Sequence, residues 1–205
     1  MMKKMLITLM LLGQAALATS AFAVQMFDFD AQAKLPAGVG GAATAIGRIV
    51  NGQAVATPIP LDFANYEYTI VVTGLTLDAA GSTSYFSSGT VVIYQDSATP
   101  SEWASPATFS DGTAILTGTL GTFQRSMFTG TLGSGIGSVD WTGGSLLGLL
   151  APADRGGWPF LTSVSSAASQ VQAGYDERWD GKVEPRQEVV GSEQLSWSEL
   201  KAGYR

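Results

Sequence analysis

The sequence from Phe109 to Leu150, FSDGTAILTGTLGTFQRSMFTGTLGSGIGSVDWTGGSLLGLL, decides the fold that we expect. It contains the pentapeptide Thr-Gly-Thr-Leu-Gly twice, at 117–121 and at 129–133. Two copies that start twelve residues apart are typical of short strands laid side by side with a turn between them. We therefore expect this stretch to form the antiparallel centre of one β domain.

A two-residue turn at Gly121-Thr122 gives this stretch a consistent register. Glycine at the first turn position suits a type II′ hairpin, because that position needs a positive φ. Arg125 falls on the apolar face that results, opposite Gly118. The apolar side chains of that face are Leu116, Leu120, Phe123 and Met127. A shift of one residue would break the pattern, so the register is specified.

The rest of the middle of the chain also favours β structure. Side chains alternate between two faces from Tyr66 to Thr73, and GTVVIYQ at 89–95 reads as a second strand. Ten of the 25 glycines lie between 109 and 150, where they separate strands at short intervals. We predict an all-β domain from 24 to 160, an antiparallel β-sandwich of jelly-roll or immunoglobulin-like type, with a barrel as the alternative.

The first 23 residues have the features of a secretory signal peptide. Lys3 and Lys4 precede an apolar region from 5 to 18, and Ala21-Phe22-Ala23 forms an A-x-A cleavage site. Polar residues interrupt the apolar region, so it is not expected to remain as a membrane anchor. We expect the export machinery to recognise this segment and the mature chain to start at Val24, in the periplasm, at the cell surface or outside the cell.

Composition excludes several classes of function. The chain has no His and no Cys, which excludes Ser-His-Asp hydrolysis, thiol nucleophiles, disulfides and cysteine zinc sites. Its net charge of −6, with 11 Lys and Arg, makes nucleic acid an unexpected partner. The glycines at 133, 135 and 137 do not continue into a dinucleotide fingerprint, since Ser138 takes the sixth position.

The composition does not exclude functions that need only oxygen-bearing side chains, such as calcium binding and carboxylate catalysis. Asp176 and Asp180, followed by Gly181, resemble the start of an EF-hand loop, but Arg178 and Gln187 stand at two ligand positions. Calcium is therefore the one cofactor considered, with Asp28 and Asp30 as a second candidate pair. A turn at Asp180-Gly181 is the alternative.

Two kinds of carbohydrate site are also considered. A glycoside hydrolase needs two acids held about 5 to 10 Å apart, and the candidate acids are Glu67, Asp96, Glu102, Asp111 and Asp140. A binding module needs exposed aromatic rings, for which Trp103 and Trp158, in expected loops, and Tyr85 are candidates. The alternative is that these rings pack against the ends of the domain.

The C-terminal part of the chain is expected to be separate from the β domain. Residues 161–191 read as a polar, charged linker, and 192–205 as a short amphipathic segment. Ser196 and Glu199 form a capping box, and Trp197, Leu200 and Tyr204 share one face of a short helix. Such a helix is too short to be stable alone, so it docks on its own domain or serves as a sorting or anchoring tag.

Together these observations predict an exported, non-enzymatic protein of the cell surface or the extracytoplasmic space, with a structural, assembly or binding role. Its partner would be a surface polysaccharide or a protein. A carbohydrate-binding module is the first alternative, and a carboxylate-based glycoside hydrolase is the second.

Overall fold

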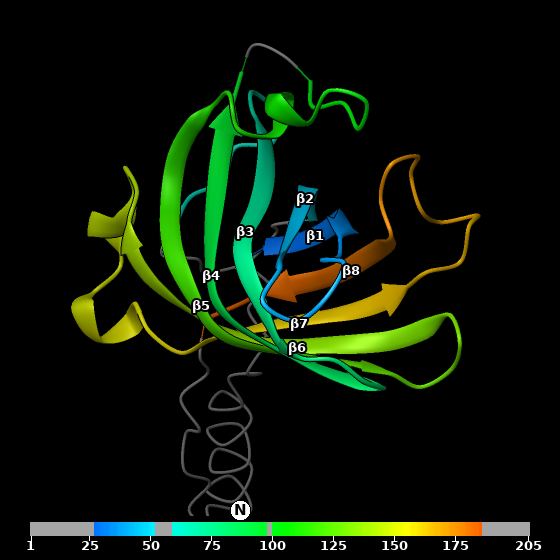
Figure 1. Ribbon diagram of the computed structural model, residues 1–205. Coiled ribbons are helices and arrows are strands. Elements are labelled where there is room, and N and C mark those ends of the chain that lie inside the picture. The colour runs from blue at the N-terminus through cyan, green and yellow to red at the C-terminus, as the bar shows by residue number, and fades with distance from the viewer. Residues whose placement is uncertain (1–26, 52–58, 98–99, 186–205) are drawn as a thin grey trace, which may run out of the picture.

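The computed structural model describes residues 27–51, 59–97 and 100–185, which form one closed antiparallel barrel of eight strands (Figure 1). Each strand pairs with the next along the chain, and the last pairs with the first. The strands are β1 (Phe27–Lys34), β2 (Ala42–Asn51), β3 (Glu67–Ala79), β4 (Thr83–Asp96), β5 (Thr113–Met127), β6 (Leu132–Gly143), β7 (Trp158–Ser165) and β8 (Glu177–Val183).

This confirms an all-β fold and corrects the predicted sandwich to the barrel alternative. The described helices are short 3-10 turns, η1 (Pro106–Phe109), η2 (Leu147–Leu149) and η3 (Pro152–Asp154). No helix within the described ranges is long and apolar enough to cross a membrane. The expected C-terminal helix lies outside the described residues.

The strands that close the barrel come from the segment expected to be a linker. The predicted domain boundary at 160 falls inside β7, and all of β8 lies beyond it. β8 has the alternation of a half-buried strand: Trp179 and Val183 point into the barrel, while Arg178 and Asp180 point outward. Three of its four charged residues, Arg178, Asp180 and Lys182, lie on the outward face, which explains why composition alone suggested a linker.

The predicted hairpin at Gly121-Thr122 is not a turn, because β5 continues through it to Met127. The inward face is nevertheless the predicted one, with Leu120 and Phe123 both buried. The alternation changes phase between these two residues, and the register against β6 shifts there, which is a β-bulge. A two-residue turn and a bulge give the same pattern of buried residues, so the sequence could not distinguish them.

The second copy of the pentapeptide has a different role from the first. The copy at 117–121 lies inside β5, whereas the copy at 129–133 makes the turn between β5 and β6. There the Thr129 hydroxyl accepts hydrogen bonds from the backbone N–H groups of Thr131 and Leu132. The repeat is therefore not two equivalent strands.

The phase change in β5 has counterparts on the two preceding strands. The inward positions shift between Val72 and Leu75 in β3 and between Phe86 and Gly89 in β4, at matching points of the register. All three long strands curve strongly in Figure 1. Phase changes aligned across neighbouring strands allow a sheet to bend and close on itself.

Aromatic side chains fill the inside of the barrel. The Phe123 ring lies 5.0 Å from Trp179, 5.8 Å from Phe160 and 5.9 Å from Phe86, measured between ring centroids. The facing positions on β6 are Gly133, Gly135 and Gly137. A Cβ atom at Gly135 would collide with the Phe123 ring, and one at Gly137 would lie 2.7 Å from Leu120. These glycines therefore provide the space that the large side chains occupy.

Antiparallel order gives the barrel two distinct ends. The connections β2–β3, β4–β5 and β6–β7 lie at the end where β1 begins and β8 finishes, which we call the terminal end. The other four connections lie at the opposite end, which we call the hairpin end and which projects to the right in Figure 1.

Candidate functional site

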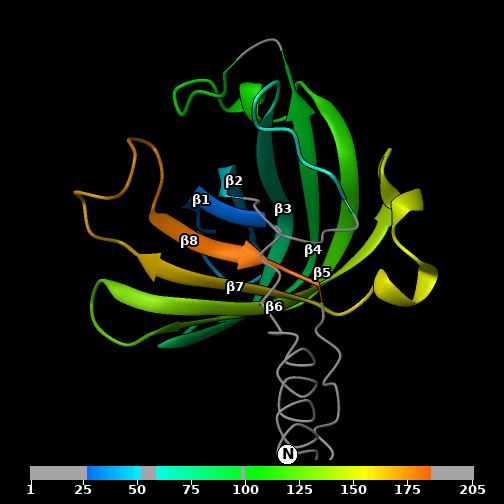
Figure 2. The same cartoon turned by 180° about the vertical axis from the view of Figure 1, so that it is seen from behind.

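A groove of about 540 Å³ opens at the terminal end of the barrel. It lies between the end of β2, the segment before β3 (shown in Figure 2), and the end of β4. The groove is lined by Arg48, Ile49, Val50, Phe63, Ala64, Asn65, Tyr66, Glu67, Tyr68, Asp96, Ser97 and Pro100. A mostly polar hollow of about 380 Å³ adjoins it and shares Tyr66, Asp96 and Ser97. We call the two together the rim groove.

Three aromatic rings form one wall of the rim groove. Tyr68 is the first inward residue of β3 and is 1% exposed, whereas Phe63 and Tyr66 are 41% and 38% exposed. Both outer rings lie edge-on to Tyr68, with centroid distances of 5.0 and 6.5 Å. The Tyr68 hydroxyl accepts a hydrogen bond of 2.9 Å from the backbone N–H of Asp62. The buried ring thus anchors two exposed ones.

Burial also raises the pKa of Tyr68 above its ordinary value of 10.0, and the nearby Asp62 carboxylate and Tyr66 add to this, while the hydrogen bond from Asp62 works against it. Tyr68 is therefore neutral at physiological pH. Its role in the groove is that of a fixed, uncharged platform.

The rim groove gathers three of the five acids considered from the sequence. Glu67 on β3 and Asp96 on β4 are cross-strand partners, and Asp111 lines the adjoining hollow with Asp96. The other two lie elsewhere: Glu102 belongs to the β4–β5 connection, and Asp140 on β6 accepts a hydrogen bond from the backbone N–H of Gly157. The sequence could not bring any two acids together, because their proximity depends on strand register.

The carboxylate of Glu67 already has a structural role. It accepts hydrogen bonds from the Ser101 backbone N–H at 2.7 Å and from the Ser101 hydroxyl at 2.8 Å. Arg48 donates through Nε to the same hydroxyl and lies 3.5 Å from the carboxylate. These contacts fix the β4–β5 connection against the outside of β2 and β3.

The three aromatic residues proposed from the sequence as ligand contacts do not come together. Trp103 lies in the β4–β5 connection, half-buried between the Arg48 guanidinium at 5.2 Å and the Phe109 ring at 4.8 Å. Trp158 is 1% exposed, and its indole N–H donates to the backbone carbonyl of Asp154. Tyr85 is 51% exposed, but on the outer face of β4 near the hairpin end.

Sequence reasoning missed Phe63 and Asn65 as groove residues and did not single out Tyr66. Tyr66 was expected to share a strand face with Tyr68, but β3 begins at Glu67. The available signal was an aromatic residue on each side of Ala64-Asn65, in a proline-containing segment directly before a strand. Such a segment is where loops carry binding residues.

The residues proposed for calcium lie in and beside β8. Asp176 accepts a hydrogen bond from the backbone N–H of Leu35, and Asp180 belongs to the strand rather than to a turn. Arg178 donates to Asp30 at 2.7 Å and to Asp180 at 2.9 Å, so the guanidinium occupies the space between the two carboxylates. Within the described ranges, no three His, Cys, Asp or Glu side chains are grouped to hold a metal ion.

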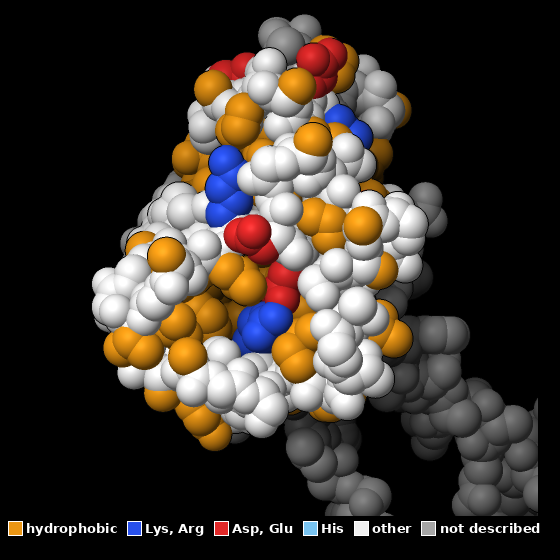
Figure 3. All heavy atoms as spheres, turned by 45° about the vertical axis from the view of Figure 1, so that its right-hand side comes forward, with side chains coloured by type: hydrophobic (Ala, Val, Ile, Leu, Met, Phe, Trp, Pro, Cys, Tyr) orange, Lys and Arg blue, Asp and Glu red, His pale blue; other side chains and the backbone are white. Residues whose placement is uncertain are grey.

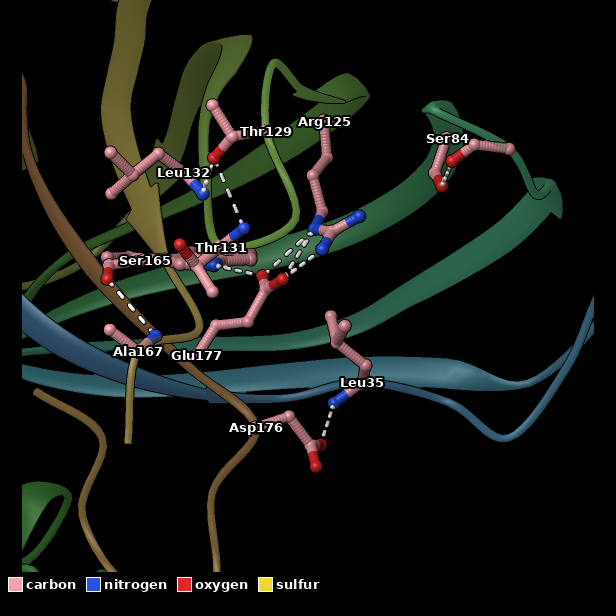
Figure 4. Close-up of polar contacts among 12 residues, drawn as sticks. Leu35, Ser84, Arg125, Thr129, Thr131, Leu132, Ser165, Ala167, Asp176 and Glu177 are labelled. Atoms are coloured by element: carbon pink, nitrogen blue, oxygen red, sulfur yellow. Dashed lines mark hydrogen bonds and ion pairs between the residues drawn. The ribbon is translucent and has the colours of Figure 1, made fainter. Parts of the chain in front are cut away.

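A second polar cluster lies at the hairpin end. Figure 3 faces this side of the molecule and shows Lys or Arg and Asp or Glu side chains lined up between apolar ones. Arg125 of β5 and Glu177 of β8 point toward each other there, as Figure 4 shows. The Glu177 side chain is 1% exposed and Arg125 is 12% exposed, so this pair belongs to the core rather than to an open site.

The remaining sequence predictions fall outside the described residues. These are Lys3 and Lys4 of the expected signal peptide and Trp197, Leu200 and Tyr204 of the C-terminal segment. Comparison with protein-family models, with curated proteins and with solved structures found no match. The rim groove is therefore the candidate site on its geometry alone.

Proposed function

We propose that this protein is an exported, non-enzymatic binding protein that holds a saccharide in the rim groove. The observation that carries the proposal is the pair of exposed rings, Phe63 and Tyr66, fixed on the buried Tyr68 beside polar groups. Flat aromatic faces stack on the apolar faces of sugar rings, and the neighbouring polar groups can bond to sugar hydroxyls.

The charge of the groove favours a neutral or cationic saccharide. Asp96 and Asp111 line the adjoining hollow, and no Lys or Arg is among the described residues that line it. Arg48, the one base among the described residues that line the larger part, already contacts Ser101, Glu67 and Trp103. An anionic polysaccharide would therefore meet carboxylates of like charge.

The hydrogen bonds that the Glu67 carboxylate accepts favour binding over catalysis. A glycoside hydrolase needs one acid to give or take a proton and another to attack or to activate water. Both oxygens of Glu67 instead accept hydrogen bonds that hold Ser101. Hydrolysis remains the second candidate function, because Glu67 and Asp96 are cross-strand partners beside an aromatic wall.

Export is part of the proposal and rests on the first 23 residues. The intact mass of the protein recovered outside the cytoplasm should correspond to a chain that starts at Val24. A recovered mass that includes Met1 would refute cleavage at this site.

The binding proposal is tested by affinity electrophoresis with a neutral glucan, with chitosan and with pectin. Phe63→Ala and Tyr66→Ala should each weaken binding by roughly tenfold, since a lost aromatic contact of about 1.4 kcal/mol corresponds to that factor. Tyr85→Ala is the matched control, because it removes an exposed ring far from the groove. Unchanged binding by both groove variants would contradict the proposal, as would a loss in the control alone.

Catalysis is tested on the same polysaccharides by release of reducing ends. We expect none from the wild type. Release that disappears in Asp96→Asn and Glu67→Gln, with binding retained, would establish the hydrolase instead.

A further inference from the structure

The outer face of β6, β7, β8 and β1 carries a second hollow of about 540 Å³, which shares Val50 with the rim groove. One row of outward side chains crosses it, because Ile136 pairs with Leu161, Leu161 with Lys182, and Lys182 with Asp28. Val50 of β2 lines the far edge. We call this the outer hollow.

The outer hollow is more apolar than the exposed side of an antiparallel barrel should be. Ile136 is 55% exposed and Val50 is 62% exposed, and Leu132 on the same face of β6 is 52% exposed. An outward face in contact with water normally carries polar residues. The lining also includes the charged residues Asp28, Asp180 and Lys182, and four small residues, namely Ser134, Gly135, Ser163 and Gly181. The hollow therefore combines exposed apolar side chains with small residues that leave room beside them.

The chain itself supplies a matching segment close by. β8 runs through the middle of the outer hollow, and the described chain finishes at Pro185, three residues after Lys182. Trp197 follows Pro185 by twelve residues, which can span up to about 40 Å. A twelve-residue strand such as β6 is also about 40 Å long. The C-terminal segment can thus reach every part of this face.

We infer that the apolar face of the C-terminal segment, Trp197, Leu200 and Tyr204, docks in the outer hollow of its own barrel. A ten-residue helix is not stable by itself in water, and it becomes stable when its apolar stripe is buried. A tether of this length gives an effective concentration in the millimolar range, which favours the chain's own tail over a separate partner. The inference does not depend on the rim groove.

The absence of native cysteine allows a direct test by disulfide trapping. The full chain carrying Ile136→Cys and Leu200→Cys should form a bridge within one molecule under mild oxidation. The chain carrying Tyr85→Cys and Leu200→Cys is the control, because Tyr85 is equally exposed but lies on β4. The products are read by intact mass and by non-reducing electrophoresis.

Hydrogen exchange of backbone amides gives a second readout, which does not require two engineered cysteines to lie within bonding distance. Deleting Ser192 to Arg205 should speed exchange at 134–136 and 161–163 at least tenfold and leave β4 near Tyr85 unchanged. A bridge specific to Ile136, or this selective change in exchange, supports docking. The inference is overturned by bridges between molecules, by equal bridging at both positions, or by no bridge together with unchanged exchange.

Discussion

Arg125 of β5 and Glu177 of β8 form an ion pair across the inside of the barrel, although their strands are not neighbours in the sheet. Arg125 Nε lies 2.9 Å from each carboxylate oxygen, and a guanidinium N–H group binds the same carboxylate. The Trp179 indole N–H donates to Glu177 at 3.1 Å. Two inward charges, which would each be costly alone, thus satisfy one another and link opposite walls.

The first prediction concerns this ion pair. Glu177→Leu should lower the free energy of unfolding by about 3–5 kcal/mol, because it leaves the Arg125 charge buried without a partner. The double variant Arg125→Met/Glu177→Leu should recover most of the loss, although the Trp179 N–H still lacks its acceptor, at about 1 kcal/mol. Urea denaturation measures the free energy of unfolding of both variants. A double variant as unstable as the single one would contradict this account.

The second prediction tests the space provided by the β6 glycines. Gly135→Ala should destabilise the protein by about 1–3 kcal/mol, because the added Cβ meets the Phe123 ring and lies 2.7 Å from a Thr162 methyl group. Thermal unfolding under identical conditions gives the comparison with the wild type. Stability equal to wild type would mean that the core can yield at this position.

Gly121→Ala is the matched control and also tests the bulge. A Cβ atom added at Gly121 would have no heavy atom within 4 Å, and the φ angle of Gly121 is not in the left-handed region. The substitution should therefore change stability by less than about 0.5 kcal/mol. A loss of about 1 kcal/mol or more would favour the type II′ turn predicted from the sequence, in which this position needs a positive φ.

The third prediction concerns the β4–β5 connection. Arg48→Lys keeps the positive charge near Glu67 but removes the planar group over Trp103 and the fork that binds Ser101. Proteolysis between residues 100 and 111 should become several times faster, while the barrel remains folded by circular dichroism. Arg155→Lys, in the β6–β7 connection, should leave that cleavage unchanged. Equal cleavage in wild type and Arg48→Lys would show that the stack does not hold the connection.

The fourth prediction is a pH dependence that arises from Asp28. Burial raises the pKa of Asp28 above its ordinary value of 3.8; Lys182 lowers it, and Glu184 and Asp180 raise it further. The folded state therefore disfavours the ionised carboxylate, and this residue destabilises the protein at neutral pH. Asp28→Asn should raise the Tm above that of the wild type at pH 7.

The sign of this effect follows from proton uptake. As the pH falls from the raised pKa of the folded state toward 3.8, the folded protein binds a proton before the unfolded chain does. The advantage of Asp28→Asn should therefore shrink across that window and vanish below it. Melting curves between pH 3 and pH 7 measure the difference, and an advantage that grows on acidification would contradict the assignment.

The sequence predicted which residues face inward better than it predicted how the strands connect. Inward and outward positions follow from alternation along one strand, so Leu120, Phe123 and even Arg125 were placed on the correct face. The path between Leu120 and Phe123 was wrong, because a bulge and a hairpin produce the same change of phase. The partner of Arg125 could not be predicted, since Glu177 lies 52 residues away, in a segment whose composition predicts a linker.

By itself, the sequence determined an all-β, cysteine-free and histidine-free domain, because period-two alternation and residue chemistry are local properties. Only the tertiary structure decided that one sheet closes on itself, since closure depends on pairing between β1 and β8 at opposite ends of the described chain. The tertiary structure also decided which residues form the rim groove. Glu67 and Asp96 become neighbours through strand register, and register is fixed by burying alternate side chains of all eight strands at once.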